Sequence, residues 1–143
     1  KNDIKYMAYK TNVGTLDALI GYYFVEDKLY TAKYIFQEKH SNRNDFISDF
    51  NKIKQILTEK YGQPNENEKI WKNDLYKNQP QDYGMAIAVG HLVYFSKWEL
   101  NKTSITLMLS GSNYKINHMI EYLSDDLVLL ARKANEKKNK SVF

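Results

Sequence analysis

The sequence predicts an α+β fold, in which an antiparallel β-sheet has the main helix packed on one face and a second helix follows at the C-terminus. Two observations predict it. Residues 29–38 alternate between apolar and polar side chains, as a half-buried strand does. Apolar residues then recur every three or four positions over residues 46–61, which indicates an amphipathic helix with one broad apolar face.

The segment before that helix has the composition of strands. We expect a short strand at residues 5–10, a turn around Gly14, and a second strand at residues 18–25, where aromatic and β-branched residues are frequent. Only a short polar connection separates this second strand from residues 29–38. The two are therefore expected to pair as a β-hairpin.

Residue types at both ends delimit the main helix. Asn44 is the predicted N-cap, because its side-chain oxygen can accept a hydrogen bond from a free amide of the first turn. Gly62 suits the position after a helix where φ is positive, and Pro64 prevents the helix from continuing. The side chains expected to face the sheet are Phe46, Phe50, Ile53 and Leu57.

The segment after the main helix is less regular. Ile70 and Trp71 are expected to begin a short strand. Residues 73–82 form a polar loop that is long for a compact domain, which makes it a place to look for function. Residues 83–89 are small and apolar, and they form either a short buried helix or a strand, because periodicity does not separate the two at that length.

Alternation returns after Gly90 in three consecutive segments, near residues 92–99, 105–110 and 114–122. Tight turns at residues 101–102 and 111–113 join them, so a three-stranded meander is expected.

The chain is expected to end in a helix and a tail. Asp125 or Asp126 can cap the helix, which continues through Ala134. The basic residues 135–143 are expected to form a flexible tail. Without a repeat or a linker, residues 1–143 are interpreted as a single domain.

Composition and motifs give no support for catalysis. The 143 residues include no cysteine, which excludes disulfides, thiolate metal sites and cysteine nucleophiles. The three histidines, His40, His91 and His118, lack metal-binding spacing, and His118 is interpreted as a hydrogen-bonded histidine of the sheet. There is no GxSxG motif and no glycine-rich phosphate loop. We therefore expect a protein that is not an enzyme, with no cofactor, no metal and no catalytic residues.

Aromatic residues are the candidates for binding. The chain has 12 tyrosines and two tryptophans. Tyrosine and tryptophan anchor many protein interfaces, although in a domain this aromatic they also fill the core. The side chains that we single out for partner binding are Trp71, Tyr76, His91 and Trp98.

One pattern resembles a known group of proteins. The aromatic run at residues 22–24, the helix end Lys60-Tyr61-Gly62-Gln63-Pro64 and the later Gly90-His91-Leu92, Trp98-Glu99 and Ser110-Gly111-Ser112-Asn113 resemble small bacterial exported proteins or lipoproteins of unknown function. The resemblance extends over most of the chain. It implies a bacterial domain outside the cytoplasm, in the cell envelope or secreted, and membrane contact only through an N-terminal anchor ahead of Lys1. It implies no catalytic residues.

Three functional hypotheses remain open at this stage. The first is a non-enzymatic domain that binds a protein or another ligand through the open face of the sheet or the loop at residues 73–82. The second is a small enzyme or ligand-binding domain with a pocket near His91, Tyr76 and Glu99. The third is nucleic-acid or anionic-surface binding through the basic C-terminal tail, without specificity for a nucleic-acid sequence. The net charge of only +4 gives the third little general support.

Overall fold

The computed structural model describes residues 4–142, and their side chains as far as residue 136. Its main feature is a seven-stranded antiparallel sheet with the strand order β1-β2-β3-β7-β6-β5-β4. The elements in chain order are β1 (Ile4–Val13), β2 (Leu16–Val25), β3 (Lys28–Phe36), α1 (Asn44–Tyr61), β4 (Glu66–Trp71), the 3-10 turn η1 (Pro80–Asp82), α2 (Tyr83–Ala88), β5 (Leu92–Leu100), β6 (Thr103–Ser112), β7 (Lys115–Ser124) and α3 (Asp125–Val142).

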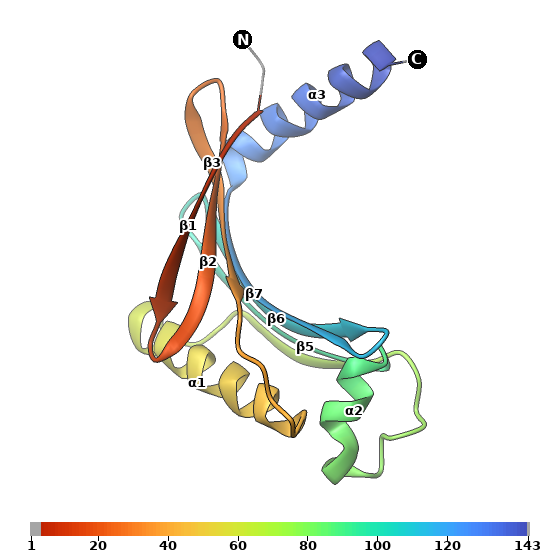
Figure 1. The fold of residues 1–143 in the computed structure, drawn as a ribbon. Helices are drawn as coiled ribbons and strands as arrows, with labels where there is room; N and C mark the ends of the chain where they lie inside the picture. Colours follow the sequence, from red (N-terminus) through yellow and green to blue (C-terminus); the bar gives the residue numbers. More distant parts are fainter. Residues whose placement is uncertain (1–3, 143) are drawn as a thin grey trace.

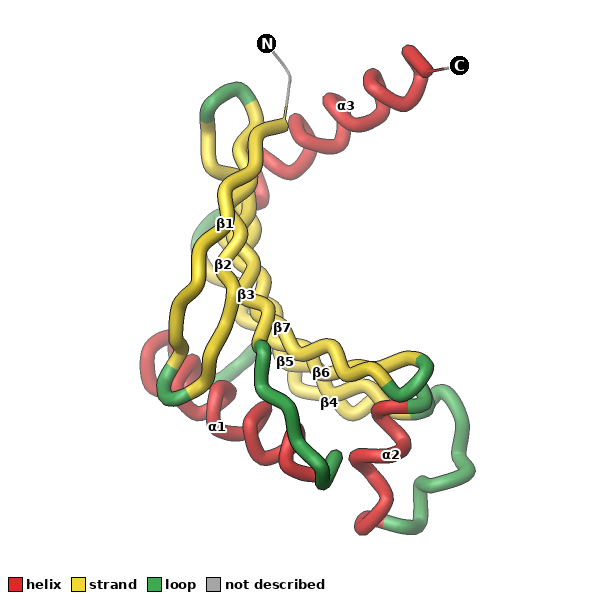
Figure 2. Tube along the Cα trace, in the orientation of Figure 1, coloured by secondary structure: helices red, strands yellow, loops and turns green. Residues whose placement is uncertain are grey.

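The predicted α+β class with an antiparallel sheet is confirmed. The sheet consists of two antiparallel groups, β1-β2-β3 and β4-β5-β6-β7, which are joined where β3 pairs with β7. It is strongly curved, with α1 and α2 on its outer side and α3 leaving from the opposite end (Figure 1). The same arrangement is visible in the secondary-structure view (Figure 2).

Helix α1 covers the outer face as its apolar pattern predicts. Phe50, Ile53 and Leu57 are buried, and they join one cluster with residues from the central strands, among them Leu107 and Ile120. Burying each large apolar side chain contributes roughly 1.5–3 kcal/mol, so this cluster is the main source of stability in the fold. Phe46 is only partly buried and lies at the edge of the cluster.

Within the part of the chain that the structure describes, a helix covers the inner face of the sheet at one end (Figure 1). There α3 packs Ala131 and Ala134 against Val25 of β2. Further along, an apolar row crosses the five inner strands and ends in a charged residue on each edge strand. In strand order, the row is Lys10, Leu19, Ile35, Met119, Met108, Phe95 and Glu68.

Asn44 does not cap α1, so that prediction is wrong. The helix begins at Asn44, and the hydrogen bond at its start comes from Asn42, whose Oδ1 accepts from the Asn44 amide at 3.0 Å. The Asn44 side chain instead bridges to the segment around α2. Its Oδ1 accepts from the Gly84 amide at 2.8 Å, and its Nδ2 donates to the Gln81 carbonyl at 2.9 Å.

Two further segments can be compared with the sequence predictions, residues 83–89 and the turn expected at residues 111–113. Residues 83–89, for which either a helix or a strand was expected, are mostly the helix α2. The turn expected at residues 111–113 lies later, because β6 continues to Ser112 and the positive φ angles are at Asn113 and Tyr114, 51° and 66°. Gly111 is a strand residue, and a Cβ there would overlap the Ile87 carbonyl of α2. Its role is therefore close packing of α2 on the sheet.

The C-terminal helix α3 begins at Asp125, as expected, and extends to Val142. The predicted flexible tail at residues 135–143 lies largely outside the residues whose side chains are described. Among the helices of the described chain, none combines the length and the apolar character that crossing a bilayer requires.

We predict that Gly84→Ala destabilises the fold. A Cβ at residue 84 would lie 2.5 Å from the Arg43 carbonyl carbon and 2.6 Å from the Asn44 nitrogen, and backbone atoms cannot move away as a flexible side chain can. Overpacking of this kind costs about 1–3 kcal/mol. Chemical denaturation followed by circular dichroism measures the loss. Ser48→Ala, at an exposed position of α1, is the control and is expected to change stability by less than about 0.5 kcal/mol. An unchanged Gly84→Ala variant would contradict the close approach.

Candidate functional site

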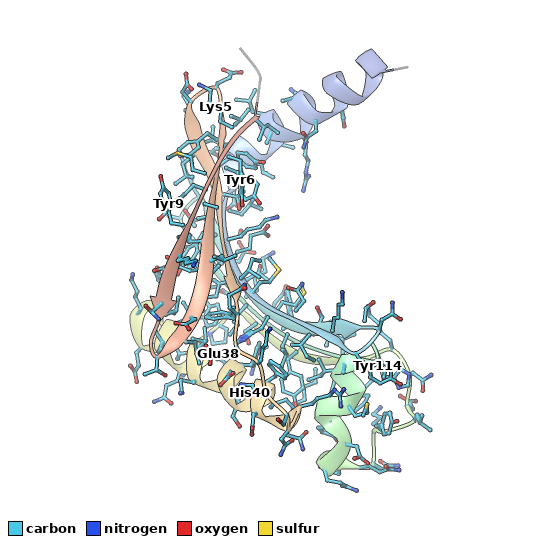
Figure 3. All side chains as sticks on the ribbon, viewed as in Figure 1. Lys5, Tyr6, Tyr9, Glu38, His40 and Tyr114 are labelled. Carbon is cyan, nitrogen blue, oxygen red and sulfur yellow. The ribbon has the colours of Figure 1, made fainter. Side chains whose placement is uncertain are left out.

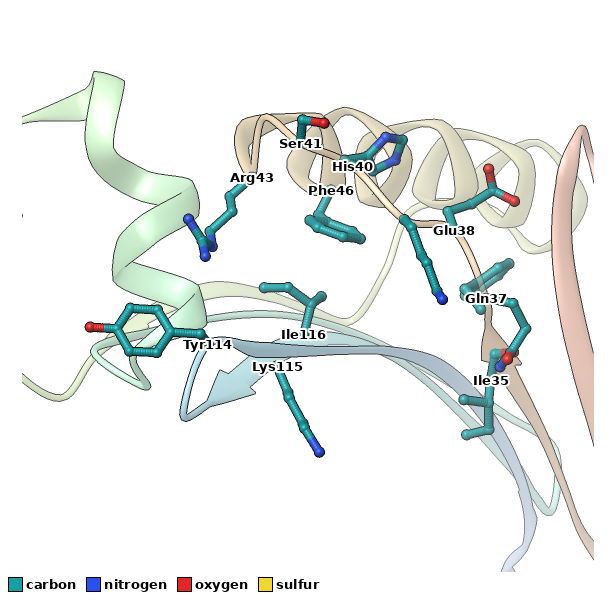
Figure 4. A pocket seen from close by; sticks show the side chains of 12 residues that line it. Ile35, Gln37, Glu38, His40, Ser41, Arg43, Phe46, Tyr114, Lys115 and Ile116 are labelled. Atoms are coloured by element: carbon teal, nitrogen blue, oxygen red, sulfur yellow. The ribbon is translucent and has the colours of Figure 1, made fainter.

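The candidate site is a hollow of about 710 Å³ between the β3–α1 loop, the start of α1 and the start of β7. Sites for small molecules typically measure ~300–1,000 Å³. Residues 35–41, 43, 46 and 114–116 line this hollow, which we call the basic cleft. Figure 3 shows where its residues Glu38, His40 and Tyr114 lie in the whole molecule, and Figure 4 shows the cleft from nearby.

The inner wall of the basic cleft is apolar. Phe46 from α1 and Ile116 from β7 point toward one another across it (Figure 4). Both are partly buried against the core, and the buried Phe36 at the end of β3 completes the wall. This surface suits an aromatic or aliphatic group of a ligand.

The charged side chains of the cleft are mostly cationic. Arg43 and Lys39 line it, and among the side chains described neither forms an ion pair. Arg43 points into the gap between α1 and β7, whereas Lys115 extends to the other side of β7 (Figure 4). Glu38 is the acidic residue of the lining, and its Oε2 already accepts a hydrogen bond from the Asp17 amide at 2.9 Å. The cleft therefore favours an anion.

Helix α2 fixes the width of the cleft, because it is hydrogen-bonded both to the start of α1 and to the β6–β7 turn. At its N-terminal end, the Gly84 amide donates to Asn44, the residue next to Arg43. At its C-terminal end, the Ala88 carbonyl accepts from the Tyr114 amide at 3.0 Å. The Arg43 guanidinium lies over the Tyr114 ring, with Cζ 5.5 Å from the ring centroid. This cation–π contact orients Arg43 while leaving its N–H groups available.

His40 fastens the loop that precedes α1. Its Nε2 lies 2.6 Å from Oδ2 of the buried Asp49, and its ring meets the Phe46 ring edge-on at 4.7 Å. Asp49 is thus engaged by His40 and does not offset the charge of Arg43. The pair holds the loop on α1, so that the cleft-lining residues 39–43 start from a fixed position.

The cations, and not the helix start, give the cleft its preference for anions. Amides at the N-terminus of a helix often bind anions. Here the Asn44 amide donates to the Asn42 side chain, and the Asp45 amide donates to the Asn42 carbonyl at 3.0 Å. These two amides already have partners, whereas Arg43 and Lys39 form no ion pair among the described side chains and can donate to a ligand.

The four residues that the sequence singled out for partner binding, Trp71, Tyr76, His91 and Trp98, do not line the basic cleft. Tyr76 and His91 come together, with ring centroids 5.8 Å apart, and Trp71 meets Tyr83 at 5.0 Å. Trp98 is 1% exposed, and its Nε1 donates to the Gly62 carbonyl at 2.8 Å, so it belongs to the core.

The structure does not bring Glu99 to the other residues of the pocket that was expected near His91 and Tyr76. His91 precedes β5, whereas Glu99 lies near the far end of that strand, roughly 25 Å away at the usual rise per residue. Glu99 pairs there with Lys97 at 2.9 Å.

The basic cleft was missed because its residues looked ordinary in the sequence. Residues 40–44 (His-Ser-Asn-Arg-Asn) form a polar stretch that leads into the helix and match no binding motif. The cluster of two cations and a histidine directly before a helix is the one signal that could have been noticed. Tyr114 and Ile116 carry no such signal, since the β6–β7 turn and strand β7 bring them to the cleft from a distant part of the sequence.

His118 is buried without the hydrogen bond that was predicted for it. It is 4% exposed, its ring stacks on Phe36 at 4.4 Å, and its Nε2 has no partner among the described residues. The expectation of a hydrogen-bonded histidine is therefore wrong at this nitrogen. Burial disfavours the charged imidazolium and lowers the pKa of His118 from its ordinary 6.5 to about 4.

We predict that His118 makes the fold sensitive to acid. The unfolded chain takes up a proton at His118 near pH 6.5, but the folded protein does so only near pH 4. The contribution of His118 to the free energy of unfolding is therefore fully present above pH 6.5. It is lost as the pH falls toward 4, by roughly 3 kcal/mol in total. Denaturation curves between pH 7 and 4 should show a smaller loss for His118→Phe than for the wild type. Acidic groups change the stability of both proteins equally. If the free energy of unfolding fell with pH by the same amount in both, the burial of a neutral His118 would be contradicted.

Neither a metal site nor a relative indicates what the cleft holds. In the described part of the chain, no three His, Asp or Glu side chains gather as a metal site would require. Comparison with family models, with curated proteins and with solved structures finds no significant match for this chain. The geometry of the basic cleft is therefore the basis for a functional proposal.

Proposed function

We propose that this chain is a non-enzymatic binding domain that holds a small amphiphilic anion in the basic cleft. The supporting observation is the juxtaposition of Arg43 and Lys39, which form no ion pair among the described side chains, with the apolar wall of Phe36, Phe46 and Ile116. A cation in such a place attracts an anionic group, and the wall beside it removes an apolar group from water.

The ligand class follows from these two halves of the cleft. The anionic end is a carboxylate, sulfate or phosphate group that accepts hydrogen bonds from the Arg43 guanidinium, a planar donor that can engage two oxygens at once. The apolar end is an aromatic ring or short aliphatic chain that lies between Phe46 and Ile116. A cleft of about 710 Å³ accommodates such a molecule.

Binding, and not chemistry, is what these groups support. Arg43 and Lys39 are donors, the wall is unreactive, and His40 Nε2 is engaged by Asp49. The resemblance to exported bacterial proteins supports a location outside the cytoplasm, where a domain of this kind would capture or present a small anion.

The proposal predicts weak but selective binding of 4-phenylbutyrate, which we use as the probe. A ligand of this size at ~0.3 kcal/mol per heavy atom binds with a Kd on the order of a millimolar. A ¹H–¹⁵N titration should show saturable shifts in residues 39–46 and 114–116. Two control ligands separate the contributions to binding. The neutral 4-phenylbutyramide lacks the negative charge and inorganic phosphate lacks the apolar group, so both are expected to bind more weakly than 4-phenylbutyrate.

The matched variants remove one positive charge each. Arg43→Gln should weaken binding of 4-phenylbutyrate at least about tenfold, because it removes a charge-assisted hydrogen bond worth ~1.5–3 kcal/mol. Lys72→Gln makes the same charge change at an exposed position outside the cleft, and it should leave the Kd unchanged. Equal losses in the two variants, or no saturable shifts at the cleft, would refute the proposal.

A further inference from the structure

The two edges of the sheet differ in how they meet solvent. Strand β4 is short, and three of its six residues are charged, Glu66, Glu68 and Lys69. Charges and short length protect an edge from pairing with another strand. The opposite edge, β1, is ten residues long, and it pairs with β2 without a bulge along its whole length.

The middle of β1 lacks these protective features. Residues 6–9 are uncharged, and Tyr6, Met7 and Tyr9 are 59%, 47% and 51% exposed. Tyr6 and Tyr9 lie on opposite sides of the strand (Figure 3). At the end of this stretch, the Lys5 ammonium forms an ion pair with Asp27 of the same chain at 2.7 Å, which offsets its charge at the edge. An exposed, regular edge of this kind is a template for a further strand.

We propose that β1 pairs antiparallel with β1 of a second copy of this chain, so that the two sheets become continuous. A two-fold axis at Ala8 gives a register in which no like charges oppose each other. Ala8 then faces Ala8, Met7 faces Tyr9, and Tyr6 faces Lys10. Opposed side chains share a face of the sheet, so each of these pairs is in contact.

The pairs formed in this register are favourable ones. The Lys10 ammonium of one copy lies beside the Tyr6 ring of the other, which is a cation–π geometry. The thioether of Met7 lies beside the Tyr9 ring, another attractive contact. An axis between Met7 and Ala8 would instead place Lys5 opposite Lys10, and the like charges would repel. The β1 sequence is thus self-complementary about Ala8, as a symmetric dimer requires.

Substitution at Ala8 tests the pairing, because this residue is exposed and meets its own copy. Sedimentation velocity on the whole chain should show a dimer of twice 16.9 kDa for the wild type at micromolar concentrations. Ala8→Lys and Ala8→Glu each place like charges on the axis, so each should be a monomer. An equimolar mixture of the two should return to a dimer, because the opposite charges then meet.

The controls separate pairing from loss of folding. Circular dichroism should be the same for all the proteins, and Ser48→Lys, at an exposed position of α1, should remain dimeric. Three results would overturn the proposal: a monomeric wild type, a dimeric Ala8→Lys variant, or a mixture of folded Ala8→Lys and Ala8→Glu that stays monomeric. None of these bears on anion binding in the basic cleft, so the two proposals succeed or fail separately.

Discussion

The position of α2 is the constraint on which the rest of the site depends. This six-residue helix is held at both ends by contacts that only glycine permits, with Gly84 against the Arg43–Asn44 backbone and Gly111 against the Ile87 carbonyl. Because the Asn44 side chain bonds Gly84 and the Ala88 carbonyl bonds Tyr114, the same helix sets the start of α1 and the β6–β7 turn. A helix displaced by one bulky side chain would move the two walls of the basic cleft relative to each other.

The distribution of charge around the basic cleft supports the proposed preference for an anion. Acidic groups lie near the cleft, yet each is engaged: Glu38 by the Asp17 amide and Asp49 by His40. Arg43 is oriented by the Tyr114 ring, and among the described side chains it forms no ion pair. Preorganised donors of this kind recognise an anion without first giving up another partner. The fold thus places carboxylates close to the site without neutralising it.

The periodicity of apolar residues predicted the secondary structure and the buried faces, because these depend on local sequence. The alternation at residues 29–38 and the spacing from Phe46 to Leu57 both reflect which face is buried, so the strands, the main helix and their packing could be inferred. The cleft could not, because Arg43 and Tyr114 are far apart in sequence and meet only through α2. The roles of Asn44 and of the unpartnered His118 nitrogen likewise depend on neighbours from other elements, which no local pattern specifies.

Hydrogen exchange at two amides tests most directly whether α2 holds the two walls. The Gly84 amide, bonded to Asn44, and the Tyr114 amide, bonded to Ala88, report its two ends. If α2 is clamped as described, both should exchange as slowly as the amide of Leu107 in the core strand β6, through global unfolding. Exchange of either amide several orders of magnitude faster than Leu107, in the intact folded protein, would show that α2 opens independently and would contradict the account.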